Sequence, residues 1–322
     1  MPENPRLSTP LTDLLAIRHP ILLAPMDRTA CAALAIAVSE AGGLGLLGGG
    51  YPDLDHLDGE LAAIAASGAR CGVGFITFAL DERPEALDLA LDASPVAVQL
   101  SFGDPRPYAD RIHAAGSLLL CGVQSPDEVA RAVEAGADVI VAQGADAGGH
   151  GRPDVGTLPL LPSVVDRVGA IPVSAAGGIT DGRGLAAALG LGAAGGELGT
   201  RFLASTLADS DPAEAAALVG AAAFDTVRTD AYDVVRGPAW PEGHDGRVVR
   251  NRFTDDWAAT GDADGLRARY RASAPDDYDV RPLWAGQGLD LVTSIDSPAE
   301  IVARTVAEAV AALRSAAARI DG

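Results

Sequence analysis

A histidine that follows a run of glycines is the feature of this chain best suited to chemistry. Residues 139–142 are apolar without alternation, and Gln143 follows them directly. A loop then leads through Gly148 and Gly149 to His150. An apolar run of this kind is typical of a strand covered on both faces, as in a parallel sheet, and glycines let backbone approach a ligand closely. We therefore expect a buried strand that opens onto an active site.

His150 is the candidate general base among the five histidines of the chain. His19 precedes the first predicted strand, His56 and His113 lie on predicted helices, and His244 lies in a later segment of different composition. Imidazole exchanges a proton near neutral pH, which suits a histidine at the end of a strand. The alternative is that His150 only hydrogen-bonds a cofactor or closes the loop.

Four other residues are candidates for supporting roles. Asp146 and Arg152 are possible orienting partners of the histidine, although solvated ion pairs would account for them equally well. Gln143 both donates and accepts, which suits a ring with mixed carbonyl and N–H edges. Met26 ends the first predicted strand and either lies beside a flat ligand or packs in the core.

Two further glycine motifs suggest a phosphate site. Gly177 and Gly178 follow the seventh predicted strand, and Gly199 and Thr200 follow the eighth. In a barrel of alternating strands and helices, the loops after strands seven and eight often bind phosphate through backbone N–H groups, assisted by a helix N-terminus. The alternative is that these glycines only permit tight turns.

The chain alternates between short apolar runs and helical patterns. Helices are expected at 125–135, where Ser125 and Pro126 form a start signal, at 82–92, and at 298–320. Eight strand–helix units favour a closed (β/α)₈ barrel, with an open doubly wound sheet as the alternative. The predicted strands are 21–26, 44–47, 71–76, 96–100, 118–121, 138–142, 171–175 and 195–198.

Residues 224–296 interrupt the alternation and are rich in Asp, Arg, Pro and Trp. We interpret this segment as a lid or appendage. The predicted organisation is thus a barrel over 1–223, the appendage over 224–296, and a C-terminal helix over 297–322 that packs on the barrel.

Composition excludes several function classes. The formal charge of −20 would repel nucleic acid. The chain has no lysine, which excludes Schiff-base, pyridoxal-phosphate and P-loop chemistry. Its three cysteines are scattered, so neither a metal site nor an iron–sulfur cluster is expected. No apolar stretch approaches the roughly 20 residues of a membrane span, and residues 1–12 lack a signal-peptide pattern. We expect a cytoplasmic protein without a membrane partner, and whether it forms a homo-oligomer stays open.

These motifs resemble those of the nitronate monooxygenase family, which are FMN-dependent (β/α)₈ enzymes. The resemblance spans roughly residues 20–209, and its most specific part is the signature that ends in His150. The matching segments are 20–26, 72–78, 143–150, 176–179 and 199–202.

The resemblance implies FMN as the cofactor and His150 as the catalytic residue. The implied reaction is oxidation of an alkyl nitronate, with O2 as oxidant, to a carbonyl compound and nitrite. For a neutral nitroalkane, His150 would first remove the proton next to the nitro group. The implied cofactor-binding residues are Ala24, Pro25, Met26, Gln143, Gly148, Gly149, Gly177, Gly178, Leu198, Gly199 and Thr200.

The chain departs from the family pattern at three places. Gly74 stands where many members have an asparagine that contacts the flavin, Glu197 stands where a neutral residue is common, and Gly151-Arg152 follows the histidine in an unusual order. Two alternatives therefore remain. One is an FMN-dependent NAD(P)H:quinone or enoyl reductase of the same barrel family, although such reductases commonly have glutamate in place of Gln143. The other is a barrel that binds a phosphate ligand without catalysis.

Overall fold

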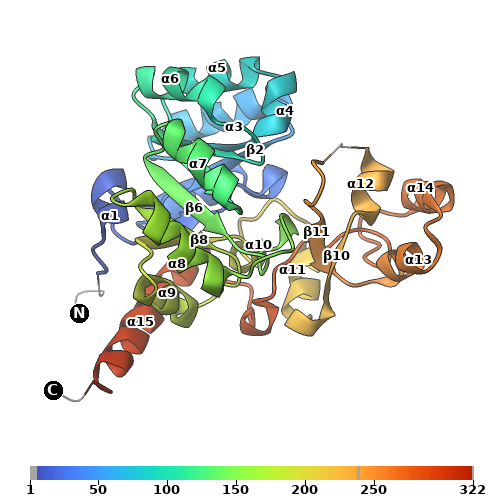
Figure 1. Ribbon diagram of the computed structural model, residues 1–322. Helices are drawn as coiled ribbons and strands as arrows, with labels where there is room; N and C mark the ends of the chain where they lie inside the picture. Colours follow the sequence, from blue (N-terminus) through green and yellow to red (C-terminus); the bar gives the residue numbers. More distant parts are fainter. Residues whose placement is uncertain (1–5, 238–239, 321–322) are drawn as a thin grey trace.

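A barrel of parallel strands forms the centre of the structure, a computed structural model that describes residues 6–237 and 240–320 (Figure 1). The strands follow the order β1-β9-β8-β6-β5-β4-β3-β2. A parallel bridge between Leu22 and Leu44 joins the two ends of this order, and the Leu23 N–H donates to the Leu44 carbonyl at 2.9 Å. The barrel is therefore closed, and the predicted (β/α)₈ fold is confirmed.

Each of the eight predicted strands is present, with ends that differ by a few residues. The barrel strands are β1 (Ile21–Leu23), β2 (Leu46–Gly50), β3 (Gly72–Ile76), β4 (Ala97–Ser101), β5 (Leu118–Val123), β6 (Val139–Gln143), β8 (Val173–Ala176) and β9 (Gly195–Leu198).

Apolar side chains fill the end of the barrel where the strands begin. Leu22 on β1 and Leu120 on β5 are fully buried in one cluster with residues from the neighbouring strands. Because side chains alternate across a strand, these residues face the barrel axis while their neighbours face the helices. Leu11 and Leu15 of α1 (Pro10–Leu15) join the same cluster, so α1 closes this end of the barrel.

Helices cover the outside of the barrel (Figure 1). α15 (Pro298–Ala317) packs against α9 (Gly182–Gly190) and α2 (Ala32–Glu40). No helix in the described parts of the chain combines the length and apolarity needed to cross a bilayer. The other helices of the barrel body are α2 (Ala32–Glu40), α3 (Leu54–Ser67), α4 (Thr77–Glu82), α5 (Glu85–Asp92), α6 (Arg106–Ala114), α7 (Pro126–Glu134), α8 (Thr157–Val168), α9 (Gly182–Gly190), α10 (Thr200–Leu203) and α11 (Pro212–Val219).

Local start and stop signals decide where these helices begin and end. The Ser125 hydroxyl accepts the Glu128 N–H, so α7 begins where its cap predicts. The single helix expected over 82–92 is wrong, because the structure has α4 and α5 on either side of Arg83-Pro84. Proline disfavours the helical conformation of the residue before it, and Arg83 accordingly has φ −139° and ψ 60°.

Residues 224–296 are called the lobe below, and its described parts, 224–237 and 240–296, lie to one side of the barrel (Figure 1). The lobe has its own apolar cluster, in which the rings of Tyr232 and Phe253 stack with centroids 5.2 Å apart. β10 (Thr226–Thr229) pairs antiparallel with β11 (Gly246–Val249), and β11 pairs antiparallel with a two-residue strand, β7 (Gly149–His150). The elements of the lobe are β10 (Thr226–Thr229), α12 (Ala231–Arg236), β11 (Gly246–Val249), α13 (Arg252–Thr260) and α14 (Ala263–Ala272). Short 3₁₀ turns lie at the start of the lobe (Ala223–Asp225), within it (Leu289–Leu291) and after β1 (Asp27–Thr29).

A polar pair spans the barrel interior above the apolar cluster. The Gln99 amide on β4 donates to Oε1 of Glu197 on β9 at 3.3 Å, and β8, β6 and β5 separate these two strands. Glu197 Oε2 and Gln99 Oε1 are buried and have no hydrogen-bond partner among the described residues. Burial raises the pKa of the Glu197 carboxyl to about 8, and the Gln99 amide only partly offsets this. Glu197 is therefore largely a neutral acid at pH 7.

We predict that Gly182→Ala destabilises the fold by about 1–3 kcal/mol, as for other overpacked sites. A Cβ at Gly182 would lie 2.3 Å from both the Ala309 nitrogen and the Thr305 carbonyl oxygen, so α9 and α15 would have to separate. Gly190→Ala is the matched control in the same helix, because a Cβ there meets nothing within 4 Å. Thermal unfolding should show a lower Tm for Gly182→Ala alone, and equal Tm values would contradict the close approach.

Glu197→Gln should make stability less dependent on pH. The folded carboxyl holds its proton more tightly than the unfolded chain does, so wild-type stability falls as the pH rises from about 4.5 to about 8. Glutamine keeps the shape and cannot ionise. The advantage of the variant in unfolding free energy should grow by a few kcal/mol between pH 5 and pH 9, measured by urea denaturation. Parallel pH profiles for the two proteins would refute the buried neutral acid.

Candidate active site

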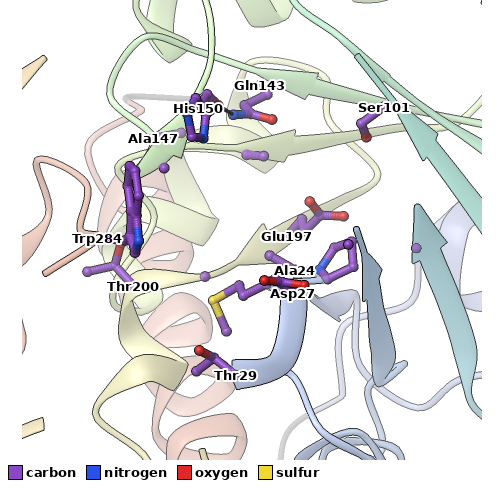
Figure 2. Close-up of a pocket in the computed structure, with 18 of the residues that line it drawn as sticks. Ala24, Asp27, Thr29, Ser101, Gln143, Ala147, His150, Glu197, Thr200 and Trp284 are labelled. Carbon is purple, nitrogen blue, oxygen red and sulfur yellow. Dashed lines mark hydrogen bonds between the residues drawn. The ribbon is translucent and has the colours of Figure 1, made fainter. Parts of the chain in front are cut away.

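A cavity of about 320 Å³ lies where the barrel strands end, within the size range of small-molecule sites (Figure 2). Glu197 and Gln99 contribute to its inner wall. The cavity brings together the predicted residues Ala24, Pro25, Met26, Gln143, Gly148, Gly149, His150, Gly177, Gly178, Gly199 and Thr200.

Leu198 is the one predicted cofactor residue that does not line the cavity. Its side chain is fully buried in the apolar cluster between the barrel and the helices. Side chains alternate along β9, so Glu197 faces inward and Leu198 faces outward. The Leu198 carbonyl instead accepts the Ala24 N–H at 3.0 Å and helps to fix the end of β1.

The glycine loops bring backbone close to the cavity. Gly177 has φ +102°, which favours glycine, and a Cβ there would lie 2.9 Å from the Ala147 nitrogen. The Thr200 hydroxyl accepts the Gly286 N–H at 2.9 Å, which leaves its own hydrogen available to donate. These features suit an anion held by N–H and O–H groups.

The expected help from a helix N-terminus is wrong for α9, the helix that follows the first of these loops. The Asp181 carboxylate accepts the N–H groups of Arg183 and Gly184, and Glu308 accepts that of Gly182. Because the protein's own carboxylates already use these donors, α9 does not offer them to a ligand.

Gln143 supports the histidine loop as well as the cavity. Its amide nitrogen donates to the His150 carbonyl at 2.9 Å, and Figure 2 shows the two side chains next to each other. The side-chain oxygen of Gln143 has no hydrogen-bond donor among the described residues, so it can accept one from a ligand.

The partner of His150 is Asp233, from α12 of the lobe. His150 Nε2 lies 2.8 Å from one Asp233 carboxylate oxygen and 3.0 Å from the other. The side chains are only 9% and 14% exposed, so this contact is shielded from water. Burial lowers the pKa of His150, and the hydrogen bond and charge of Asp233 act against that shift.

The two orienting partners expected from the sequence lie elsewhere. The Asp146 carboxylate accepts the Thr157 N–H, and Arg152 pairs with Asp154 at 3.2 Å. The physical reason is the β7–β11 pairing, which matches His150 with Gly246 and turns the loop toward the lobe.

Aromatic rings surround His150. The Trp240 indole stacks on the imidazole with centroids 3.7 Å apart and planes 2° from parallel, and Trp284 lies 5.1 Å away. The Trp240 N–H donates to the Tyr51 hydroxyl at 2.6 Å, which ties the lobe to the loop after β2. Composition marked the lobe as rich in tryptophan, but no spacing rule connects Trp240 or Asp233 with His150.

Two arginines of the lobe hold the histidine loop through its carbonyl groups. Arg228 on β10 donates to the carbonyls of Gly151 and Asp245 at 2.7 Å and of Ala145 at 3.0 Å. Arg247 on β11 donates to the same Ala145 carbonyl. The position of His150 therefore depends on the lobe.

Gly74, where the family pattern has an asparagine, lies against Pro25. A Cβ at Gly74 would lie 2.3 Å from Cγ of Pro25. A side chain at this position is sterically blocked, so any ligand contact made by that asparagine is absent here.

Comparison with known proteins identifies the family of the chain. The family model for nitronate monooxygenase matches residues 8–83 and 76–308. The chain is 37% identical to a nitronate monooxygenase of Metarhizium robertsii, with 93% of each chain covered.

Solved structures show the same likeness. The chain aligns with nitroalkane oxidase from Streptomyces ansochromogenes at a TM-score of 0.80 and 31% identity, covering 95% of this chain and 99% of that one. It aligns with FabK from Thermotoga maritima at a TM-score of 0.84 and 30% identity, covering 98% and 100%. The chain belongs to the nitronate monooxygenase family of flavin-dependent oxidoreductases.

Proposed function

We propose that this protein uses FMN and O2 to oxidise alkyl nitronates, and nitroalkanes after deprotonation, to carbonyl compounds and nitrite. The observation that carries the proposal is the position of His150, which lies at the rim of the cavity and hydrogen-bonds a shielded carboxylate. A histidine in such a place can take a proton from a substrate that enters the same cavity.

The residues of the cavity fit FMN. Gly177, Gly178, Gly199 and Thr200 would hold the phosphate through N–H groups and the threonine hydroxyl, since Cβ atoms are absent at the three glycines. Gln143 would face the ring edge with its carbonyl oxygen, and Ala24, Pro25, Met26, Gly148 and Gly149 would contact the ring system. Bound FMN would supply the electron acceptor for the nitronate and pass the electrons to O2.

The chain itself handles the proton and the exclusion of water. For a neutral nitroalkane, the bond between hydrogen and the carbon next to the nitro group breaks, and the proton moves to the His150 ring. The bonding electrons delocalise onto the nitro group, which gives the nitronate. Trp240 and Trp284 shield the ring from bulk water. A nitronate arrives without that proton, so its oxidation does not need the base.

The three segments expected from the sequence also have proposed roles. Residues 1–223 and the C-terminal helix of 297–322 would form the flavin-binding body, and 224–296 would face the substrate. The second role is supported by the contacts of Asp233, Trp240 and Trp284 with His150.

A reductase of the same barrel family is the second candidate function. It is favoured by the alignment with FabK over nearly the whole chain, and the Gly-Gly-His loop also resembles that of FMN-dependent enoyl reductases. Such a protein would take its electrons from a nicotinamide cofactor.

His150→Ala should separate the two nitro substrates. We expect nitrite release from nitroethane to fall by about 100-fold or more in kcat/KM, the usual size of a general-base contribution, while that from ethylnitronate falls only a few-fold. Both rates can be followed as nitrite produced per flavin.

His113→Ala is the control for this experiment, because His113 lies on α6 and contacts Asp138 outside the cavity. It should retain both activities. Full nitroethane activity in His150→Ala would overturn the assignment of the base.

A further inference from the structure

Asp233 binds His150 at one ring nitrogen and leaves the other one open. Both carboxylate oxygens lie within 3.0 Å of Nε2, so Nε2 carries a hydrogen toward Asp233. Nδ1 has no hydrogen-bond partner among the described residues. In a neutral imidazole with hydrogen on Nε2, Nδ1 holds the lone pair that accepts a proton.

The imidazole is held in this orientation from several sides. The His150 backbone pairs with Gly246 of β11, and the His150 carbonyl accepts a hydrogen bond from the Gln143 side-chain amide. One face of the imidazole stacks on Trp240. Tilting the ring out of its plane would break the stacking, and turning it over within that plane would move Nε2 away from Asp233. The ring is therefore prepared for one proton-transfer geometry before substrate arrives.

Three charged groups act on the imidazole. Asp233 and Arg236 come from α12, and Arg228 comes from β10. Burial has the largest effect and lowers the pKa of His150. The Asp233 hydrogen bond and charge raise that pKa, and the two arginines lower it further. Trp240 and Trp284 cover the ring without adding a titratable group.

We propose that Asp233 is a positioning residue that holds the His150 tautomer with hydrogen on Nε2, so that Nδ1 accepts the substrate proton. This inference rests on the proposed function. In the step, the C–H bond breaks, its proton forms a bond with Nδ1, and its electron pair remains on the nitronate. The resulting imidazolium is stabilised by the Asp233 carboxylate on its other side.

Asp233→Asn tests this role, because asparagine keeps the size and removes the charge. We expect kcat/KM for nitroethane to fall by about 100-fold or more, while that for ethylnitronate changes by less than about threefold. The ascending limb of the nitroethane pH profile should also move to lower pH, because the carboxylate that raises the pKa of His150 is gone. If Asp233 had a purely structural role, kcat/KM would fall equally for both substrates and the ascending limb of the pH profile would stay in place.

Asp230→Asn is the matched control. Asp230 precedes the same helix and accepts the Trp257 indole N–H at 2.7 Å, so its carboxylate bonds a lobe side chain other than His150. It should keep the wild-type pH profile and the wild-type ratio of the two activities.

Nitrogen-15 NMR of the flavin-loaded protein provides a readout apart from activity. The His150 signals are identified by their absence in His150→Ala. At pH 8 the wild type should show hydrogen on Nε2 and none on Nδ1, and Asp233→Asn should show a mixture or the reverse. Hydrogen on Nδ1 in the wild type would overturn the inference.

The outcomes separate this inference from the proposed function. If the wild type releases no nitrite from either substrate, the proposed function fails and the NMR result alone decides the role of Asp233 in setting the tautomer. If the wild type oxidises nitronate but not nitroethane, no proton is removed and the inference is overturned. If Asp233→Asn retains the wild-type nitroethane rate and pH limb, it is overturned while the proposed function stands.

Discussion

The docking of the lobe onto the histidine loop is the interaction on which the site depends. β7 is only two residues long and pairs with β11, while Arg228 and Arg247 both donate to the Ala145 carbonyl of the histidine loop. Burial, followed by the nearby Arg247, lowers the pKa of Arg228 to about 10, so the guanidinium is still charged at neutral pH. Charge-assisted hydrogen bonds to several carbonyls offset the cost of burying it. Without this docking, Asp233 and Trp240 would not reach His150.

The barrel supplies the other half of the site. Its interior changes from the apolar cluster around Leu22 and Leu120 to the Gln99–Glu197 pair and then to the open cavity. The apolar end stabilises the fold, and the polar end keeps space and hydrogen-bonding groups for a ligand. The Glu197 carboxyl is largely neutral at pH 7. A neutral carboxyl costs less free energy to bury at such a place than a charged one does.

Features encoded locally were predictable from the sequence. Hydrophobic runs and glycine turns predicted the eight strands, and a serine followed by proline predicted the start of α7. The prediction of a single helix over 82–92 was wrong because the helical pattern did not account for the effect of Pro84 on the backbone of Arg83. The cavity residues lie at or just after the ends of the barrel strands, and the topology of a barrel brings these strand ends together.

Long-range partners were not predictable in this way. Asp233 and Trp240 lie far from His150 in sequence, in a segment whose composition indicated an appendage and nothing about its docking. Asp146 and Arg152 were close in sequence and therefore attractive, yet the β7–β11 pairing points the imidazole away from them. Strand alternation could have placed Leu198 outside the cavity, because Glu197 beside it faces inward.

The most direct test of the account is anaerobic mixing of the flavin-loaded protein with ethylnitronate and, separately, with NADH. Without oxygen, a flavin that accepts electrons from one of these compounds loses its visible absorbance. The account predicts rapid loss with ethylnitronate and none with NADH. Loss with NADH alone would contradict it and identify the protein as a reductase.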